Sequence, residues 1–124
     1  MSKTIWYLED NTDQFLTVKE ILSIELEEAI EIVHIESFQG LQNRISTDRI
    51  PSLLIADNQL PKANFLNEFT SSIELQNAAK ECPVIVFSGD ASIEEKAHVN
   101  GLYFVEKSID HQVLLSTCTK LLSS

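Results

Sequence analysis

Acidic side chains follow two apolar segments of this sequence. Glu9 and Asp10 come directly after the apolar run at 4–8, and Asp57 follows the run at 53–56. Carboxylates held together repel one another and raise each other's pKa unless a cation lies between them. A hard divalent ion suits such a group, and Mg²⁺ fits best because it accepts one or two carboxylates and keeps several waters. The three acids predict a metal site for Mg²⁺ (or Mn²⁺).

A hydroxyl group and an ammonium group follow two further apolar runs. Ser88 comes directly after 84–87, and Lys107 lies just past 102–105. Beside a metal, the lysine would neutralise charge on a bound phosphoryl group and the serine would donate a hydrogen bond to it. Phosphoryl transfer to a carboxylate needs an aligned nucleophile and cations that absorb negative charge. We therefore predict Asp57 as the nucleophile, with Lys107 and Ser88 as its catalytic partners.

Each of these residues also has an ordinary structural explanation when it is taken singly. An acid at the end of a strand is commonly a helix N-cap or a solvated loop residue. A serine there is commonly a turn residue, and an isolated lysine usually lies in solvent. The functional interpretation depends on all five residues lying at the same end of one sheet.

Strand-length apolar runs alternate with segments of helical period along the chain. The five runs are 4–8, 30–35, 53–56, 84–87 and 102–105. The second contains Glu31 and His34, which predicts an exposed edge strand, whereas the other four are almost wholly apolar, as strands buried on both faces are. Strands alternating with helices predict a parallel sheet covered on both faces.

Helices are predicted from apolar residues at helical spacing. For the first helix, Asn11 or Thr12 is the expected N-cap. Ser92 and Glu95 form a capping box that predicts a short fourth helix. The apolar sets are Phe15, Val18, Leu22 and Leu26; Leu41 and Ile45; Phe65, Phe69 and Ile73; and Leu114, Cys118, Leu121 and Leu122.

The predicted fold class is α/β: a flavodoxin-like (βα)5 doubly wound parallel sheet with strand order 2-1-3-4-5, forming one domain over 1–124. Right-handed crossovers place helices on both faces of such a sheet. Its ligand site lies at the carboxyl ends of the strands, near the switch between the first and third strands. The three carboxylates would therefore converge, with Ser88 and Lys107 beside them.

The formal net charge of -10 over 124 residues limits the classes of partner. A polyanion would be repelled across the ~8 Å screening distance at physiological salt, so we expect no direct contact with nucleic acid or an anionic membrane. Metal cations and basic protein surfaces are favoured. No apolar run approaches the ~20 residues of a membrane span, and the first residues do not resemble a signal peptide, so we expect a cytoplasmic protein.

Cysteines and histidines give no site. Cys82 and Cys118 have neither metal-ligand spacing nor a disulfide framework, and we predict that both are reduced packing residues. The histidines, His34, His98 and His111, are scattered without ligand or phosphotransfer spacing, and we assign them no function.

Four segments resemble the receiver domains of two-component response regulators, and the resemblance covers essentially the whole chain. IWYLEDN resembles the first strand and acidic pair of that family, and LLIADNQLP resembles its phosphoacceptor segment. VIVFSG resembles its hydroxyl strand and YFVEK its lysine strand. The resemblance implies a receiver domain of the single-domain type.

Residue by residue, the resemblance implies that Asp57 is the phosphoacceptor and Asp10 a direct metal ligand. It implies that Glu9 is a ligand acting largely through water, and that the main-chain carbonyl of Gln59 completes the protein's share of the metal shell.

Further roles are implied by the same match. Ser88 would follow the phosphoryl group, Lys107 would pair with it, and Phe104 would be the switch aromatic. Gln59 and Asp90 would occupy the two variable positions that tune the rate of dephosphorylation.

The implied function is a signalling switch of a phosphorelay, not an enzyme, although it would assist its own phosphorylation and dephosphorylation. Its partners would be a histidine kinase or a histidine phosphotransfer protein and a downstream protein target. The alternative is a phosphorylation-independent (pseudo-receiver) interaction module. A flavodoxin-like cofactor binder is disfavoured, because Glu9 and Asp10 would repel a cofactor phosphate after the first strand.

The sequence departs from the family pattern at three places, of which Ser108 and the short segment 88–107 concern the output surface. Ser108 replaces the usual proline, whose bond is often cis, and a cis bond costs a non-proline residue ~3 kcal/mol, so we predict a trans loop. The stretch 62–65 lacks the usual glycine, and Asn64 is expected to supply a positive φ. The segment 88–107 is about three residues short, which predicts a trimmed fourth helix.

Overall fold

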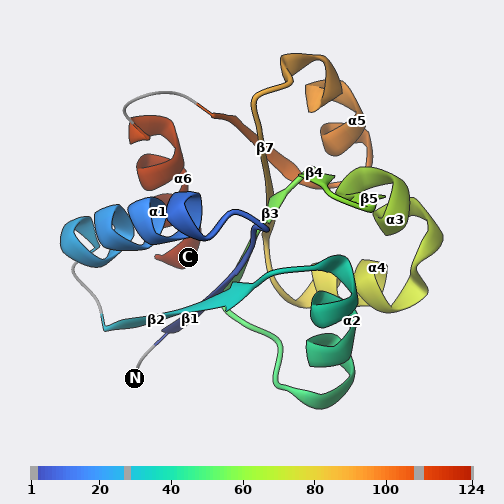
Figure 1. Ribbon diagram of the computed structural model, residues 1–124, viewed down its shortest axis with the longest axis horizontal. Coiled ribbons are helices and arrows are strands. Elements are labelled where there is room, and N and C mark those ends of the chain that lie inside the picture. Colours follow the sequence, from blue (N-terminus) through green and yellow to red (C-terminus); the bar gives the residue numbers. More distant parts are fainter. Residues whose placement is uncertain (1–2, 27–28, 108–110, 124) are drawn as a thin grey trace.

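Five parallel strands form the central sheet, in the order β2-β1-β3-β6-β7 (Figure 1). The computed structural model describes residues 3–26, 29–107 and 111–123. With the strands of this sheet numbered along the chain, the order is 2-1-3-4-5, which confirms the predicted flavodoxin-like fold. The strands are β1 (Lys3–Leu8), β2 (Ile30–Ile35), β3 (Leu53–Asp57), β6 (Val84–Ser88) and β7 (Tyr103–Glu106).

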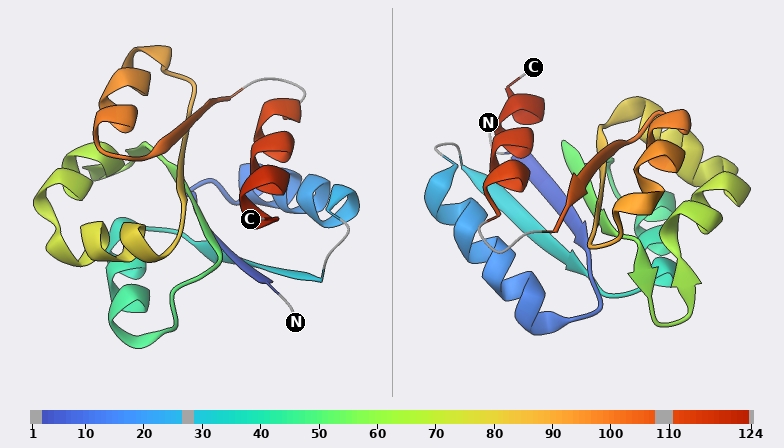
Figure 2. Two further views of the ribbon diagram at one scale, coloured as in Figure 1. Left: turned by 180° about the vertical axis from the view of Figure 1, so that it is seen from behind. Right: turned by 90° about the horizontal axis from the view of Figure 1, so that it is seen from above.

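Helices cover both faces of this sheet, as Figure 2 shows from above. One face packs against α1 (Thr12–Glu25) and α6 (Gln112–Leu122). The other packs against α2 (Phe38–Thr47), α3 (Phe65–Ser71), α4 (Ile73–Glu81) and α5 (Glu94–Val99). Among the described residues, no helix is long and apolar enough to cross a membrane.

Alternate residues of β1 pack into two separate hydrophobic cores, one on each face of the sheet. Trp6 and Leu8 pack with the α2–α5 layer, whereas Ile5 and Tyr7 pack with α1 and α6. This division follows from the period of two in a strand, because successive side chains point to opposite faces. Trp6 is buried, and both cysteines are buried and free, as predicted for the cysteines.

The two edge strands differ from what their sequences predict. β2 is an edge, as its polar residues indicate. β7 is the opposite edge, so the prediction that it is buried on both faces is wrong: Tyr103 is 46% exposed and only Val105 is buried. An apolar run alone does not distinguish a central strand from an edge strand with one covered face.

The predicted third helix is divided into two. Ser72 ends α3, and its hydroxyl accepts a hydrogen bond from Leu75 N (3.1 Å) as the N-cap of α4. Ile73 therefore begins a new helix and is 70% exposed, so its assignment to the apolar stripe of Phe65 and Phe69 is wrong. Serine competes for backbone groups in this way because its side chain is short.

Caps at the remaining helices give a mixed result. Asn11 caps α1, as one of the two alternatives predicts, since its side chain accepts from Gln14 N. The prediction of a capping box at Ser92 is wrong. The side chain of Asp90 accepts from Ser92 N and caps a 3-10 turn (Ala91–Ile93), and α5 begins after this turn, at Glu94. α5 has six residues, as the short segment predicts.

A small antiparallel sheet follows the main-sheet strand β3 and is not predicted by the sequence pattern. It pairs β4 (Gln59–Leu60) with β5 (Ala63–Asn64). Asn64 has a φ of −109° and caps α3 through its side chain, so the predicted positive φ at this residue is wrong. The tight hairpin between β4 and β5 reverses the chain direction without the glycine that the family pattern has in this loop.

Candidate functional site

The carboxyl ends of the three central strands bring the predicted chemical groups to one edge of the sheet. Leu8 is paired with Ala56, and Asp57 is paired with Phe87 of the next strand. The residues that follow β1 therefore lie beside the end of β3, at the meeting point of β1, β3 and the start of α1 in Figure 1. Parallel pairing thus places acids from distant parts of the sequence side by side.

The three predicted acids converge. Glu9, Asp10 and Asp57 each offer a carboxylate oxygen, and these oxygens lie within 4.8 Å of one another. Glu9 is 1% exposed and Asp57 is 7% exposed, whereas Asp10 is open to solvent. This combination gives a half-buried pocket with one side accessible to a ligand.

Lys107 reaches into the same pocket from the loop after β7. Its Nζ lies 3.5 Å from Asp57 Oδ2 and 3.6 Å from Glu9 Oε1, and 5.5 Å from the ring centroid of Phe87. Its backbone N–H donates to the carbonyl oxygen of Ser88 at 2.9 Å, which fixes the main chain at Lys107. The lysine therefore supplies a positive charge next to both buried acids.

One lysine does not balance this pocket. The pKa of Glu9 is raised from 4.5 to about 7, first by burial and then by repulsion from Asp57. Lys107 and the N–H of Asn11, which donates to Glu9 Oε2 at 3.2 Å, act in the opposite direction. A divalent cation among these oxygens would relieve the repulsion, and an all-oxygen donor set suits Mg²⁺. The residues present therefore fit the predicted metal.

Ser88 is buried at the end of β6, one residue beyond the partner of Asp57. Its Oγ accepts a hydrogen bond from the N–H of Asp90 at 3.1 Å. The same hydroxyl can then donate its hydrogen to a different acceptor, such as an oxygen of an incoming group.

Asp57 is held by its neighbours along the chain. The N–H of Gln59 donates to Asp57 Oδ1 at 3.3 Å. The next residue, Asn58, is buried, and its Oδ1 accepts from Leu66 N at 2.9 Å. Sequence reasoning missed Asn58, although an amide directly after a buried strand is a signal that it bonds to nearby backbone.

The remaining predicted residues lie on the segments that follow Asp57 and Ser88 and on β7. Gln59 is exposed in β4, and Asp90 is exposed at the cap of the 3-10 turn. Phe104 is half-buried on β7 and packs against the core on the α2–α5 side. Ser108, which carries the expectation about the trans loop, lies outside the described residues.

Two residues next to Glu9 were not predicted from the sequence. The hydroxyl of Tyr7 donates to Glu9 Oε1 at 3.3 Å, and His34 Nε2 lies 2.7 Å from the carbonyl oxygen of Glu9. Burial is the first cause, and the charge of Glu9 the second, that raises the pKa of Tyr7 far above its usual value. Parallel pairing of Tyr7 with His34 is the tertiary fact that places them together.

Comparison by sequence finds no match for this chain, whereas comparison by structure finds several. No protein-family model matches the sequence, and no curated protein matches it. The solved structure of the chemotaxis response regulator CheY4 of Vibrio cholerae matches with a TM-score of 0.78 and 17% identity, over 98% of this chain and 100% of that one. The phosphorylated cyanobacterial phytochrome response regulator RcpA matches with a TM-score of 0.73 and 20% identity, over 98% and 91%.

NtrX from Brucella abortus matches with a TM-score of 0.76 and 25% identity, over 99% of this chain and 28% of that one. These proteins share the order and packing of the elements described above. The chain therefore has the fold of response regulator receiver domains.

Proposed function

We propose that this protein is a phospho-accepting switch of a two-component or phosphorelay system, phosphorylated on Asp57. The observation that carries the proposal is the convergence of Glu9, Asp10 and Asp57 within 4.8 Å, with Lys107 Nζ 3.5 Å from Asp57. A nucleophilic carboxylate flanked by further acids and a lysine is what acyl phosphate formation requires.

Glu9, Asp10, Asp57 and the carbonyl of Gln59 would hold Mg²⁺, which would offset the negative charge of an incoming phosphoryl group. A carboxylate oxygen of Asp57 forms the new bond to phosphorus. The bond from phosphorus to the donor, a phosphohistidine nitrogen or an acetyl oxygen, breaks, and the leaving group keeps the electron pair.

The side chains on the other side of the pocket complete the arrangement. The ammonium group of Lys107 neutralises charge on the transferred group, and the hydroxyl of Ser88 donates a hydrogen bond to it. Ser88 would draw toward the new charge, and Phe104 would rotate on β7 in response. The signal would pass to a downstream protein through the surface that this changes, and exposed Gln59 and Asp90 would tune the lifetime. We propose a cytoplasmic location.

The buried acids favour this function over a phosphorylation-independent interaction module. Burying two carboxylates beside each other costs free energy, because the charged forms lose hydration and repel one another. A module that acts only through its surface gains nothing from this arrangement. Binding of a metal and transfer of a phosphoryl group would both require these acids. The site geometry therefore supports the switch.

The test is an intact-mass measurement after incubation with Mg²⁺ and acetyl phosphate. We expect one phosphoryl group on the wild type and none on Asp57→Asn. Asp13→Asn, which changes an exposed acid in the first turn of α1, is the matched control and should accept the group as the wild type does. Failure of the wild type to accept it from acetyl phosphate and from a panel of kinases would favour the interaction module.

A further inference from the structure

We propose that Tyr7, Phe15 and His34 form an aromatic bracket that positions Glu9, and with it the acidic pair, for metal binding. None of the three is itself a metal ligand or a nucleophile in the proposed function, on which this inference rests. Tyr7 contacts the carboxylate of Glu9 and His34 contacts its main chain, so the bracket holds the residue at two points.

The main-chain contact replaces a missing sheet partner. The N–H of Glu9 continues the β1–β2 ladder by donating to the carbonyl of Ile35 at 2.9 Å. β2 ends at Ile35, and within the described residues no backbone N–H donates to the carbonyl of Glu9. His34 Nε2, at 2.7 Å, takes that place. Because a carbonyl oxygen only accepts, Nε2 must carry the hydrogen.

Phe15 fixes the orientation of the imidazole. The two rings are stacked, with centroids 3.9 Å apart and planes 6° from parallel. Phe15 is buried near the start of α1, so its own position is set by the core. A stacked imidazole can move within its plane but tilts only at the expense of this contact, which keeps Nε2 directed at the carbonyl of Glu9.

Tyr7 connects the same ring to the carboxylate. Its ring centroid lies 5.8 Å from that of Phe15, and its hydroxyl donates to Glu9 Oε1 at 3.3 Å. Tyr7 is fully buried, so the hydroxyl reaches Glu9 from beneath the pocket. Phe15 thus packs against Tyr7, which contacts the side chain of Glu9, and against His34, which contacts its backbone.

The bracket acts on more than one ligand. Asp10 and Asn11 directly follow Glu9, and Asn11 both caps α1 and donates its N–H to Glu9 Oε2. A rotation of the Glu9 peptide would therefore turn the acidic pair away from Asp57. A leucine at position 34 could fill the same space, but it would supply no donor, so packing alone does not require a histidine here.

Two substitutions at one position separate the donor from the ring. His34→Phe keeps a ring for stacking and removes the donor, whereas His34→Gln keeps an amide N–H near the place of Nε2 and removes the ring. Mg²⁺ affinity is measured by calorimetry, and the free energy of unfolding by urea denaturation with EDTA. We expect His34→Phe to weaken Mg²⁺ binding about fivefold, the factor for one ordinary hydrogen bond, with His34→Gln within about twofold of the wild type.

Tyr7→Phe tests the second contact and should weaken Mg²⁺ binding by a similar factor, since it removes only the hydroxyl. Equal loss of Mg²⁺ affinity in His34→Phe and His34→Gln, in step with lost stability, would mean a packing role and overturn the proposal. Wild-type affinity in His34→Phe would also overturn it.

Two further measurements do not depend on metal binding. Nitrogen-15 NMR of the imidazole should show the hydrogen of His34 on Nε2, and hydrogen exchange at the Asp10 amide should be faster in His34→Phe. Nε2 without its hydrogen would overturn the bracket. If the wild type binds no Mg²⁺ while these two NMR results hold, the proposed function fails and the positioning of Glu9 stands.

Discussion

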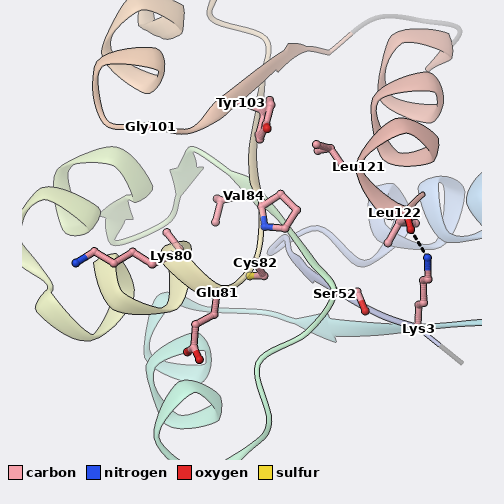
Figure 3. A pocket seen from close by; sticks show the side chains of 12 residues that line it. Lys3, Ser52, Lys80, Glu81, Cys82, Val84, Gly101, Tyr103, Leu121 and Leu122 are labelled. Atoms are coloured by element: carbon pink, nitrogen blue, oxygen red, sulfur yellow. Dashed lines mark hydrogen bonds between the residues drawn. The ribbon is translucent and has the colours of Figure 1, made fainter. Parts of the chain in front are cut away.

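The two ends of the central sheet differ in what they do with polar groups. At the carboxyl end, four residues with polar side chains, Glu9, Asp57, Asn58 and Ser88, are buried. At the amino end, a hollow of about 540 Å³ is lined by residues that include Lys3, Ser52, Lys80 and Tyr103 (Figure 3). The charged ends of Lys3, Lys80 and Glu81 point to different sides there. Convergence of buried charge, rather than the size of a hollow, distinguishes the candidate site.

Charges at the amino end support the fold instead. Lys3 Nζ donates to the carbonyl of Leu122 in the last turn of α6, as the dashed line in Figure 3 marks. Lys80 lies in the last turn of α4. A cation at a helix C-terminus interacts favourably with the exposed carbonyls and the helix dipole. The amino end thus uses charge for stability, whereas the carboxyl end places like charges together at a cost in stability.

Among the changes that test this difference between the two ends, removal of the metal should have the largest effect on phosphorylation. With EDTA in place of Mg²⁺, we expect no detectable phosphorylation from acetyl phosphate, because the repulsion among Glu9, Asp10 and Asp57 is then uncompensated. Intact mass over a time course measures this, and re-addition of Mg²⁺ should restore uptake. Uptake at the wild-type rate in EDTA would show that the acidic group is not a metal site.

Loss of the lysine should have the next largest effect. Lys107→Ala removes the positive charge that lies 3.5 Å from Asp57, and we expect phosphorylation to slow by about 100-fold, the usual effect of deleting one such group. Lys96→Ala, in α5, is a matched control outside the pocket and should leave the rate within about twofold. A slowing of less than threefold in Lys107→Ala would separate the lysine from the transfer step.

The cost of the buried acids should appear as a pH dependence of stability in the metal-free protein. The pKa of Glu9 is 4.5 ordinarily and about 7 in the fold. Between these values the folded protein holds a proton that the unfolded chain has lost, so this group destabilises the fold progressively as the pH rises from about 4.5 to about 7. The upper limit of this destabilisation is about 3.5 kcal/mol, at ~1.4 kcal/mol for each tenfold change in proton affinity.

Urea denaturation in EDTA measures this effect, with Glu9→Gln as the control. The free energy of unfolding of Glu9→Gln relative to the wild type should increase across that pH range, because glutamine does not titrate. A difference that stays constant between pH 4.5 and pH 7 would contradict the raised pKa.

The fold and the converging acids could be predicted from the sequence because both depend on simple periodicity. Buried parallel strands are recognisable as apolar runs, and whatever follows such a run must lie at one edge of the sheet. Glu9, Asp57 and Lys107 were found in this way. The helix break at Ser72 and the cap at Asp90 were not, because a short polar side chain can bond to several backbone groups and local sequence does not say which.

The contacts of Tyr7 and His34 with Glu9 could be recognised only once the pairing of β1 with β2 was known. A tyrosine inside an apolar strand indicates only a buried ring, and a histidine on an edge strand indicates only partial exposure. Their convergence on Glu9 follows from the register that pairs them. Sequence reasoning can therefore locate groups at strand ends more readily than groups that reach the same place from within strands.

The smallest expected effect is at the amino end, and it tests whether the two ends are independent. Lys80→Ala should lower the free energy of unfolding by no more than about 0.5 kcal/mol, since an exposed cation near a helix C-terminus contributes a few tenths of a kcal/mol. It should leave Mg²⁺ affinity and phosphorylation within about twofold, because Lys80 lines the amino-end hollow and the acids lie at the carboxyl end. A change in either of more than about fivefold would mean that the two ends communicate through the sheet, and that charge at the amino end also serves the site.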